Sequence, residues 1–266
     1  MTGSGSESRQ LATVGRACDV IRTLNQLEEA GVTEVAAHVG ISKSSAHAYL
    51  NTLRKKHLVV QTDGKYRLSL EFLYLGNAVQ RRNILFTYGK PVVEELAAET
   101  GEYVHLMCEQ HGLERNILKC AGEHAVGEEY HATKEQEPDY LHFTASGKAV
   151  LAALPEQRVE SIIEDHDLPE KTAKTITEPS DLFEELSTIR SRGYAINDEE
   201  EVVGIRAVGA PIRDANGGVL GAISVSGPTG RFTLDRCHET FSGTVTESAN
   251  VIEAKLNMSS ASKSMQ

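Results

Sequence analysis

Residues 17–56 constrain the fold most strongly, because they contain three consecutive helical patterns with a tight turn between the second and the third. Apolar residues recur at spacings of three and four in the first pattern, 17–30, and again in the third, 43–56. The short second pattern, 34–39, follows Thr33 as a candidate N-cap. Three helices with a glycine-containing turn between the last two are typical of a helix-turn-helix.

A hairpin signal follows the third helix directly. The β-prone runs 58–61 and 65–68 flank Asp63 and Gly64, and Asp-Gly is among the strongest short-range signals for a two-residue hairpin turn. Ser42 is a candidate N-cap for the helix that precedes this hairpin. A helix-turn-helix with a hairpin appended is a winged helix, so we expect an all-α N-terminal domain with a β-hairpin wing.

The third helix should bury its apolar stripe and leave small polar and basic side chains on the opposite face. Such a face suits entry into the major groove of double-stranded DNA, where hydroxyl, amide and imidazole groups can bond to base edges. The alternative is an ordinary solvated face, but basic charge, turn and wing coincide here and favour DNA. The candidate DNA contacts are Lys43, Ser44, Ser45, His47, Asn51 and Arg54 on the helix, and Lys65 and Arg67 on the hairpin.

The formal net charge of -11 does not exclude a nucleic-acid partner, because the charge is unevenly distributed. Residues 1–85 contain 11 Lys and Arg against 7 Asp and Glu, a balance of +4, and the remainder contains 16 against 31, a balance of -15. A basic front and an acidic back indicate two modules with different partners.

The sequence after Pro91 alternates helical patterns with strands joined by short turns, which indicates an α+β domain. A helix expected from Ser69 to Phe86 connects the modules, and its apolar face is larger than a lone linker needs, so we expect it to pair with a partner. Gly89-Lys90-Pro91 is expected to end it. The predicted organisation is a disordered lead at 1–10, the winged helix-turn-helix at 11–68, a linker helix at 69–88, a GAF-like effector-binding domain at 89–257 and a disordered tail at 258–266.

Several classes of protein are disfavoured by composition. The sequence has no apolar run long enough for a transmembrane helix and no signal-peptide pattern, so we expect a cytoplasmic protein with no membrane partner. The four cysteines lack a CxxC pair and are expected to be free thiols.

Four sequence patterns that can indicate a catalytic, phosphate-binding or metal-binding site in other proteins give little support for one in this chain. Gly147-Lys148 lacks the spacing of a phosphate loop, so Lys148 is interpreted as a surface or helix-start cation. The run 199–201 can be read as general acid/base residues, but a solvated acidic edge is the better interpretation. No metal site is expected from the scattered set His105, Cys108, His111 and Cys120, and no orienting partner is apparent for a Cys/His nucleophile among them.

No cofactor and no enzymatic activity are therefore expected. Two alternatives stay open: an enzyme with a front module that recruits it to DNA or protein, and a non-enzymatic sensor that binds a protein through the exposed helix.

Five sequence blocks resemble the isocitrate-lyase-regulator (IclR) family, and they occur in the family's order. The first is the helix-turn-helix TEVAAHVGISKSSAHAYLNTL. The others are LHFTASGKA at 141–149, GYAINDEE with GIR at 193–206, API at 210–212 and ISVSGP at 223–228. The resemblance implies a dimeric or tetrameric transcription regulator whose C-terminal GAF-like domain binds a small effector, commonly an organic acid or an aromatic catabolite.

The resemblance also implies which residues line the effector pocket, carried over motif by motif. Two departures bear on effector identity: Asn197 stands where an acid is usual, and Ala207 where the family often has cysteine. The implied effector contacts are Thr144, Ala145, Ser146, Asn197, Ile205, Ala207, Ser224 and Ser226. The residues themselves support this in part, since Ser224 and Ser226 share one face of a strand.

The acidic excess, with only 12 lysines, further indicates a high-salt cytoplasm such as that of a halophilic archaeon. Salt weakens phosphate contacts. Direct base contacts and dimer spacing are therefore expected to contribute a larger share of the affinity for DNA than the net charge of +4 on residues 1–85 suggests.

Overall fold

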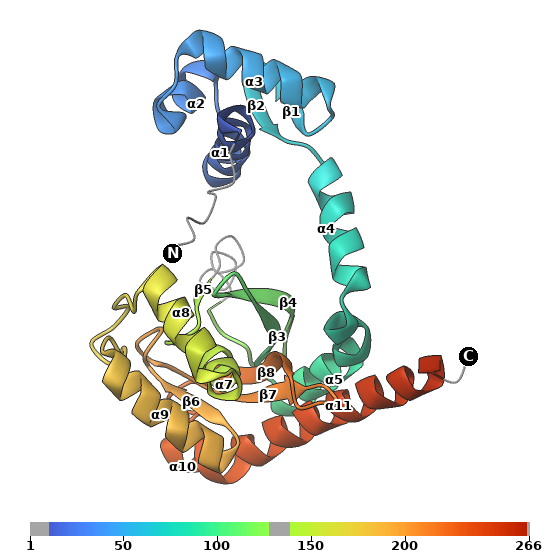
Figure 1. Ribbon diagram of the computed structural model, residues 1–266, viewed down its shortest axis with the longest axis vertical. Helices are drawn as coiled ribbons and strands as arrows, with labels where there is room; N and C mark the ends of the chain where they lie inside the picture. Colours follow the sequence, from blue (N-terminus) through green and yellow to red (C-terminus); the bar gives the residue numbers. More distant parts are fainter. Residues whose placement is uncertain (1–10, 128–138, 265–266) are drawn as a thin grey trace, which may run out of the picture. The chain divides into compact units, whose positions relative to one another are not determined.

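The computed structural model describes residues 11–127 and 139–264, and the chain divides into two compact units (Figure 1). The first unit is Met1–Val79 and the second is Gln80–Gln266. Because the division falls between Val79 and Gln80, it lies closer to the N-terminus than the expected boundary between residues 88 and 89. The expected lead at 1–10 lies outside the described residues.

The first unit is a winged helix-turn-helix, as expected. Its helices and its antiparallel hairpin enclose one apolar core that includes Leu24, Val35, Leu50 and Tyr66. The hairpin turns at Asp63 and Gly64, which both have positive φ. The elements are α1 (Ala12–Leu27), α2 (Val32–Val39), α3 (Lys43–Lys55), β1 (Val59–Thr62) and β2 (Lys65–Leu68).

The two predicted helix caps of this unit have different outcomes. Ser42 caps α3, because its hydroxyl accepts a hydrogen bond from the Ser45 amide at 3.1 Å. The prediction for Thr33 is wrong: α2 begins at Val32 with Gly31 as its N-cap. The Glu34 carboxylate in the first turn reaches back and accepts from the amide of the N-cap residue, Gly31, at 2.7 Å.

The connector expected from Ser69 to Phe86 is two helices rather than one. Helix α4 (Glu71–Arg82) ends before Asn83, whose side chain accepts from the Leu85 amide at 2.8 Å and caps the next helix. Helix α5 (Ile84–Thr100) then runs through the Gly89-Lys90-Pro91 segment, which was expected to interrupt the chain. Proline removes one helical hydrogen bond, and the burial of this helix offsets that loss.

The second unit is built on one antiparallel sheet with the strand order β5-β4-β3-β8-β7-β6. The turn between β3 and β4 is formed by His111 and Gly112, both with positive φ. The two-residue strand β5 was not expected from the sequence. The strands are β3 (Tyr103–Gln110), β4 (Leu113–Ala121), β5 (Asp139–Tyr140), β6 (Ala195–Asp198), β7 (Ile205–Arg213) and β8 (Val219–Pro228).

Helices cover both faces of this sheet, and strand alternation determines which side chains meet which helices (Figure 1). On β3, Val104 and Leu106 join the core under α5 and α11, whereas Met107 joins the core under α7, α8 and α9. His105 has the same parity as Met107 and therefore lies on the α7 face. The helices are α7 (Ala145–Ala153), α8 (Glu156–His166), α9 (Pro179–Arg192) and α11 (Ser242–Ser264).

The C-terminal helical region differs from the single helix expected over 234–256. A short α10 (Leu234–Arg236) leads into a π-helical turn, Cys237–Phe241, before α11 begins. Helix α11 continues to Ser264, so residues 258–264 are helical and the expected disordered tail is wrong over that stretch.

Candidate functional site

The exposed face of α3 brings the predicted DNA-contacting residues together. Lys43, Ser44, His47 and Arg54 are exposed, while Ser45 and Asn51 are half-buried. Ala46, Leu50 and Leu53 form the opposite, buried face. On β2, Lys65 and Arg67 alternate with the buried Tyr66 and therefore share the exposed side of the hairpin.

Two of the predicted cations already have partners within the unit. The Lys65 ammonium lies 2.6 Å from a carboxylate oxygen of Glu29. This contact raises the pKa of Lys65 and lowers the pKa of Glu29. The Arg54 guanidinium donates to the amide oxygens of Asn51 and Gln61, each at 3.2 Å. These contacts tie Arg54 to Asn51 and to β1, and tie Lys65 to Glu29, before any DNA is present.

In the second unit, four of the predicted effector residues lie on the α7 face of the sheet. Asn197, Ala207 and Ser226 are direct cross-strand partners on β6, β7 and β8. Ser224 lies two residues from Ser226 on β8 and is buried. Ile205 pairs with Pro228 at the end of β7 and is only half-buried, so it lies at the border of this polar group.

The first turn of α7 packs directly against the sheet beside Ser224 and Gly209. A Cβ added to Gly209, the cross-strand partner of Ser224, would come within 2.7 Å of the Ala145 carbonyl carbon. The backbone of α7 therefore rests directly on the sheet, and only glycine fits beneath it. Thr144 caps the helix by accepting from the Gly147 amide at 2.9 Å. Thr144, Ala145 and Ser146 are accordingly brought next to the β8 serines.

A buried carboxylate beside the first turn of α7 was not expected from the sequence. Glu114 on β4 is buried, and Thr144 Oγ1 donates to its Oε2. Ser146 Oγ donates to its Oε1 at 3.1 Å. The hydroxyls of Thr144 and Ser146 are thus already hydrogen-bonded to a side chain of the protein itself. The sequence signal that could have identified Glu114 is a charged residue within a β-prone run.

His105 is the second residue that sequence reasoning did not assign to this site. It is 4% exposed, pairs across the strands with Ser224 and lies with Nε2 3.4 Å from Ser226 Oγ. From the sequence, His105 was a candidate only for a metal site or a Cys/His nucleophile, and neither was expected. Among the residues that the structure describes, no group of three potential ligands is arranged to hold a metal.

Two residues interpreted from the sequence as solvated charges are buried: Lys148, and Glu200 of the 199–201 run. Lys148 on α7 is 1% exposed, and its ammonium lies 2.5 and 2.7 Å from the two carboxylate oxygens of Glu200. Glu185 on α9 lies 3.8 Å away. Burial raises the pKa of Glu200, and the contacts with Lys148 oppose that rise.

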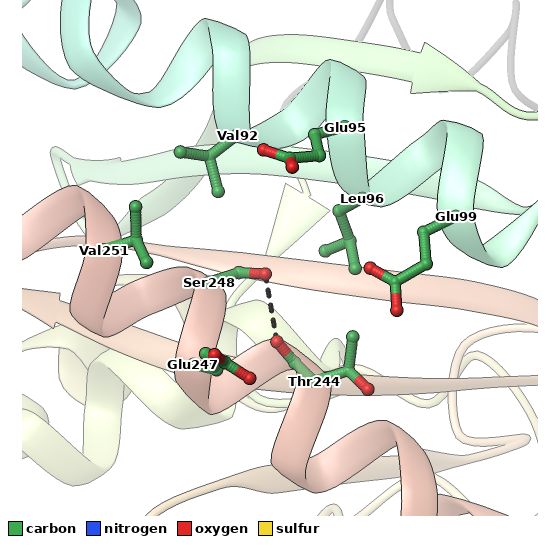
Figure 2. Close-up of a pocket in the computed structure, with 8 residues that line it drawn as sticks. All are labelled: Val92, Glu95, Leu96, Glu99, Thr244, Glu247, Ser248 and Val251. Carbon is green, nitrogen blue, oxygen red and sulfur yellow. Dashed lines mark hydrogen bonds between the residues drawn. The ribbon is translucent and has the colours of Figure 1, made fainter.

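Two hollows lie outside the predicted effector residues. One, of about 420 Å³, is lined by Lys148, Glu200 and His238 among others. The other, of about 340 Å³, lies between α5 and α11 and carries the carboxylates of Glu95, Glu99 and Glu247 (Figure 2). The second hollow is on the helical layer that covers the opposite face of the sheet, so it is separate from the polar group beside α7.

All four cysteines are free thiols, as expected. Over the described stretches of chain, no helix is both long and apolar enough to cross a bilayer.

Two family models together cover most of the chain. A model described as the IclR helix-turn-helix domain matches residues 13–63. A model described as bacterial transcriptional regulator IclR C-terminal matches residues 76–254. The chain belongs to the IclR family of transcriptional regulators.

Individual IclR-family proteins are similar over nearly the whole chain. A probable HTH-type transcriptional regulator, ArcR, of the halophilic archaeon Halobacterium salinarum is 34% identical over 254 residues, 95% of this chain and 97% of that protein. The crystal structure of the Thermotoga maritima IclR has a TM-score of 0.73 at 32% identity, covering 93% of this chain and 99% of that one. The family and the ArcR relative are named as transcriptional regulators and not as enzymes, which favours regulation over the enzyme alternative.

A further IclR homolog, from Microbacterium hydrocarbonoxydans, was crystallised in complex with 4-hydroxybenzoate. Its structure has a TM-score of 0.77 at 22% identity and covers 92% of this chain and 98% of that one, a likeness of fold. The halophilic origin of the ArcR relative agrees with the high-salt origin indicated by the acidic composition.

Proposed function

We propose that this IclR-family regulator binds a pseudo-palindromic operator through α3 and that a small-molecule effector in the second unit changes its affinity for DNA. Support for the first part comes from the exposed face of α3, which carries Lys43, Ser44, His47 and Asn51, and from the exposed cations of the hairpin in the same unit. Side chains of these types can bond to base edges and phosphates. This arrangement is the observation that carries the proposal.

The effector site we propose is the polar group between the sheet and the first turn of α7. Buried polar side chains usually satisfy one another or a bound molecule, and Ser224, Ser226, Asn197 and His105 gather here on one face of the sheet. The complex of the Microbacterium protein with 4-hydroxybenzoate supports an acid as the effector class. We propose an organic, sugar-derived or aromatic acid for this chain.

The proposed protein partner is a second copy of this chain, in a homodimer or homotetramer acting in the cytoplasm. Helix α4 buries none of its residues, although Leu73, Tyr74, Leu75 and Val79 are large and apolar. Exposed apolar area of this kind marks an association surface. Pairing of two copies also matches a two-fold operator.

The decisive experiment combines DNA binding with an effector screen. The purified protein should protect its own upstream region from nuclease, and at least one acid from a panel of sugar acids, keto acids and aromatic acids should change that affinity. The double variant Lys43→Ala, Asn51→Ala should lose DNA binding while keeping its circular dichroism spectrum. Retained DNA binding in that variant contradicts docking through α3, and an affinity unchanged by every acid contradicts the effector proposal.

A further inference from the structure

Helix α4 carries large apolar side chains on two nearly opposite sides, although it buries none of its residues. At 3.6 residues per turn, Leu73 and Tyr74 lie on one side of the helix, and Leu75 and Val79 lie on the other. These four residues are between 49% and 72% exposed. A helix packed against α4 covers one such stripe, so pairing with a single partner helix leaves the other stripe uncovered.

An arginine extends each stripe. Arg82 follows Leu75 by seven positions and Val79 by three, so it lies on their side of the helix, whereas Arg81 follows Tyr74 by seven and lies on the other side. Both arginines are exposed, and no carboxylate of the described residues forms an ion pair with either of them. The second stripe, which consists of Leu75, Val79 and Arg82, therefore combines apolar area with a cation.

The hollow between α5 and α11 has the complementary composition (Figure 2). The apolar part of its lining is Val92, Leu96 and Val251. The carboxylates around it are those of Glu95, Glu99 and Glu247, which are all exposed. In the described parts of the chain, no lysine, arginine or histidine pairs with any of these three. Lys90 on α5 lies 3.7 Å from Glu94 instead. The hollow therefore offers apolar area edged by negative charge.

We propose that the second stripe of α4 docks on the α5–α11 hollow of a second copy of this chain. This inference rests on the self-association proposed above and adds the surface that receives α4. A helix with its side chains is about 10–12 Å across, so a hollow of about 340 Å³ receives side chains of the docked helix rather than the helix itself. Leu75 and Val79 then cover the apolar lining, and the Arg82 guanidinium lies among the three carboxylates.

Charge favours this contact over the pairing of two hollows. A two-fold contact places the same patch of each copy face to face, so pairing of the α5–α11 hollows would bring two sets of three carboxylates together at a large electrostatic cost. The second stripe instead brings a cation to these carboxylates. Pairing of two α4 helices through Leu73 and Tyr74 leaves the second stripe available for this contact.

The test is a double-variant cycle on the full-length protein, measured by analytical ultracentrifugation over a series of concentrations. Arg82→Glu should raise the concentration at which half of the protein is assembled by about tenfold, because it places a carboxylate among three others. In the background Glu95→Gln, Glu99→Gln, Glu247→Gln the same change should have an effect of less than about twofold, since the repelling carboxylates are gone. All four residues are exposed, so the variants should keep the wild-type circular dichroism spectrum.

Arg81→Glu is the matched control, because it makes the same change of charge one position away, on the stripe of Tyr74. Its effect on assembly should be the same in the wild-type and the triple-variant backgrounds. The pair Leu75→Gln, Val79→Gln tests the apolar part of the contact and should weaken assembly in both backgrounds, since it removes apolar area that docking takes out of water.

The outcomes separate this contact from self-association in general. Equal effects of Arg82→Glu in the two backgrounds, or no effect in either, overturn docking on the α5–α11 hollow and leave self-association through α4 intact. A wild-type protein that stays monomeric at every concentration overturns the proposed self-association and this inference together.

Discussion

The ammonium of Lys148 lies 2.5 Å from Oε1 of Glu200, and the lysine is almost completely buried. This pair joins α7, whose first turn carries Thr144 and Ser146, to the segment that follows Asn197 on β6. A buried ion pair contributes little net stability over apolar residues of the same size, but removal of one partner leaves a buried charge. The pair therefore acts chiefly to fix α7 against the end of β6.

Removal of one partner should cost more than removal of both. Lys148→Met is expected to lower the free energy of unfolding by about 3–5 kcal/mol, because Glu200 is left in a buried site. The double variant Lys148→Met, Glu200→Gln should recover a large part of that loss. Urea unfolding followed by circular dichroism measures both. Equal destabilisation of the single and double variants would show that the charge of Glu200 is not the cause.

Gly209 should tolerate no side chain. The added methyl of Gly209→Ala would lie 2.7–2.8 Å from the backbone of Ala145 and Ser146, so α7 must move away from the sheet. We expect a loss of about 1–3 kcal/mol in unfolding free energy and a weaker response to effector. Gly243→Ala is the control: this exposed glycine lies in α11 with no neighbouring atom within 4 Å of an added Cβ. That change should be neutral or stabilising, and a similar loss in both variants would refute the steric argument.

His142 should make stability fall at mildly acidic pH. Burial lowers its pKa from 6.5 to about 4, and its Nε2 donates to the Pro169 carbonyl at 3.1 Å. Since the unfolded chain then binds a proton more readily than the folded one, this histidine favours folding above pH 6.5. The contribution is lost as the pH falls from 6.5 toward 4, by about 3 kcal/mol in total.

The histidine can be separated from other titrating groups by comparison with His142→Gln, which keeps a donor for Pro169. Unfolding free energies at pH 7, 6, 5 and 4 should decline less steeply in the variant than in the wild-type protein. Parallel declines in the two proteins would assign the acid sensitivity to other groups.

Glu29 should restrain the affinity of the wing for DNA. Its carboxylate holds the Lys65 ammonium at 2.6 Å, so Glu29→Gln leaves that cation available to a phosphate. Operator affinity should rise, and the slope of log affinity against log salt should steepen by about 0.9 for each phosphate that Lys65 then contacts.

The control for Glu29 is Asp19→Asn, the same change of charge on α1 at a residue 3.5 Å from Arg22. An equal steepening in both variants would indicate a general effect of net charge. We also expect the wild-type slope to be shallower than about -10, since base contacts and dimer spacing carry much of the affinity.

Polar substitutions on α4 should weaken self-association. Leu73→Gln combined with Tyr74→Gln removes apolar area from a helix that buries none of its own side chains. Analytical ultracentrifugation should show a shift toward monomer at micromolar concentration. The circular dichroism spectrum of the protein should stay unchanged. Val60→Gln, at a less exposed apolar residue of the same unit, is the control. An unchanged oligomeric state would place the interface elsewhere.

The features predicted correctly from the sequence include several that depend only on residues close together in the chain. The cap of Ser42, the turn at Asp63-Gly64 and the shared sheet face of Ser224 and Ser226 each depend on neighbouring residues, and each is present in the structure. The break at Asn83 was missed because Gly89 and Pro91 look like stronger helix breakers. The apolar contacts of α5 with the sheet, which no local pattern reveals, keep that segment helical.

The candidate site was only partly predictable for the same reason. Family motifs named the serines of β8 and the first turn of α7, but not the residues that the sheet register brings beside them. Glu114 and His105 come from β4 and β3, about 30 and 120 positions from their hydrogen-bond partners. Lys148 and Glu200 were each interpreted as solvated because charged side chains usually are. Only the fold shows that they neutralise each other.

The absence of any buried residue in α4 has a mechanical consequence. A helix of 12 residues is marginally stable by itself in water, and this one buries no residue within its own chain, its anchor to the sheet being the Gln80 side chain, which donates to the Ile117 carbonyl at 2.7 Å. In a dilute monomer the segment should therefore fluctuate and transmit little force between the units. A rigid connection exists only while another molecule covers the helix, so communication between the two halves of the regulator should depend on protein concentration.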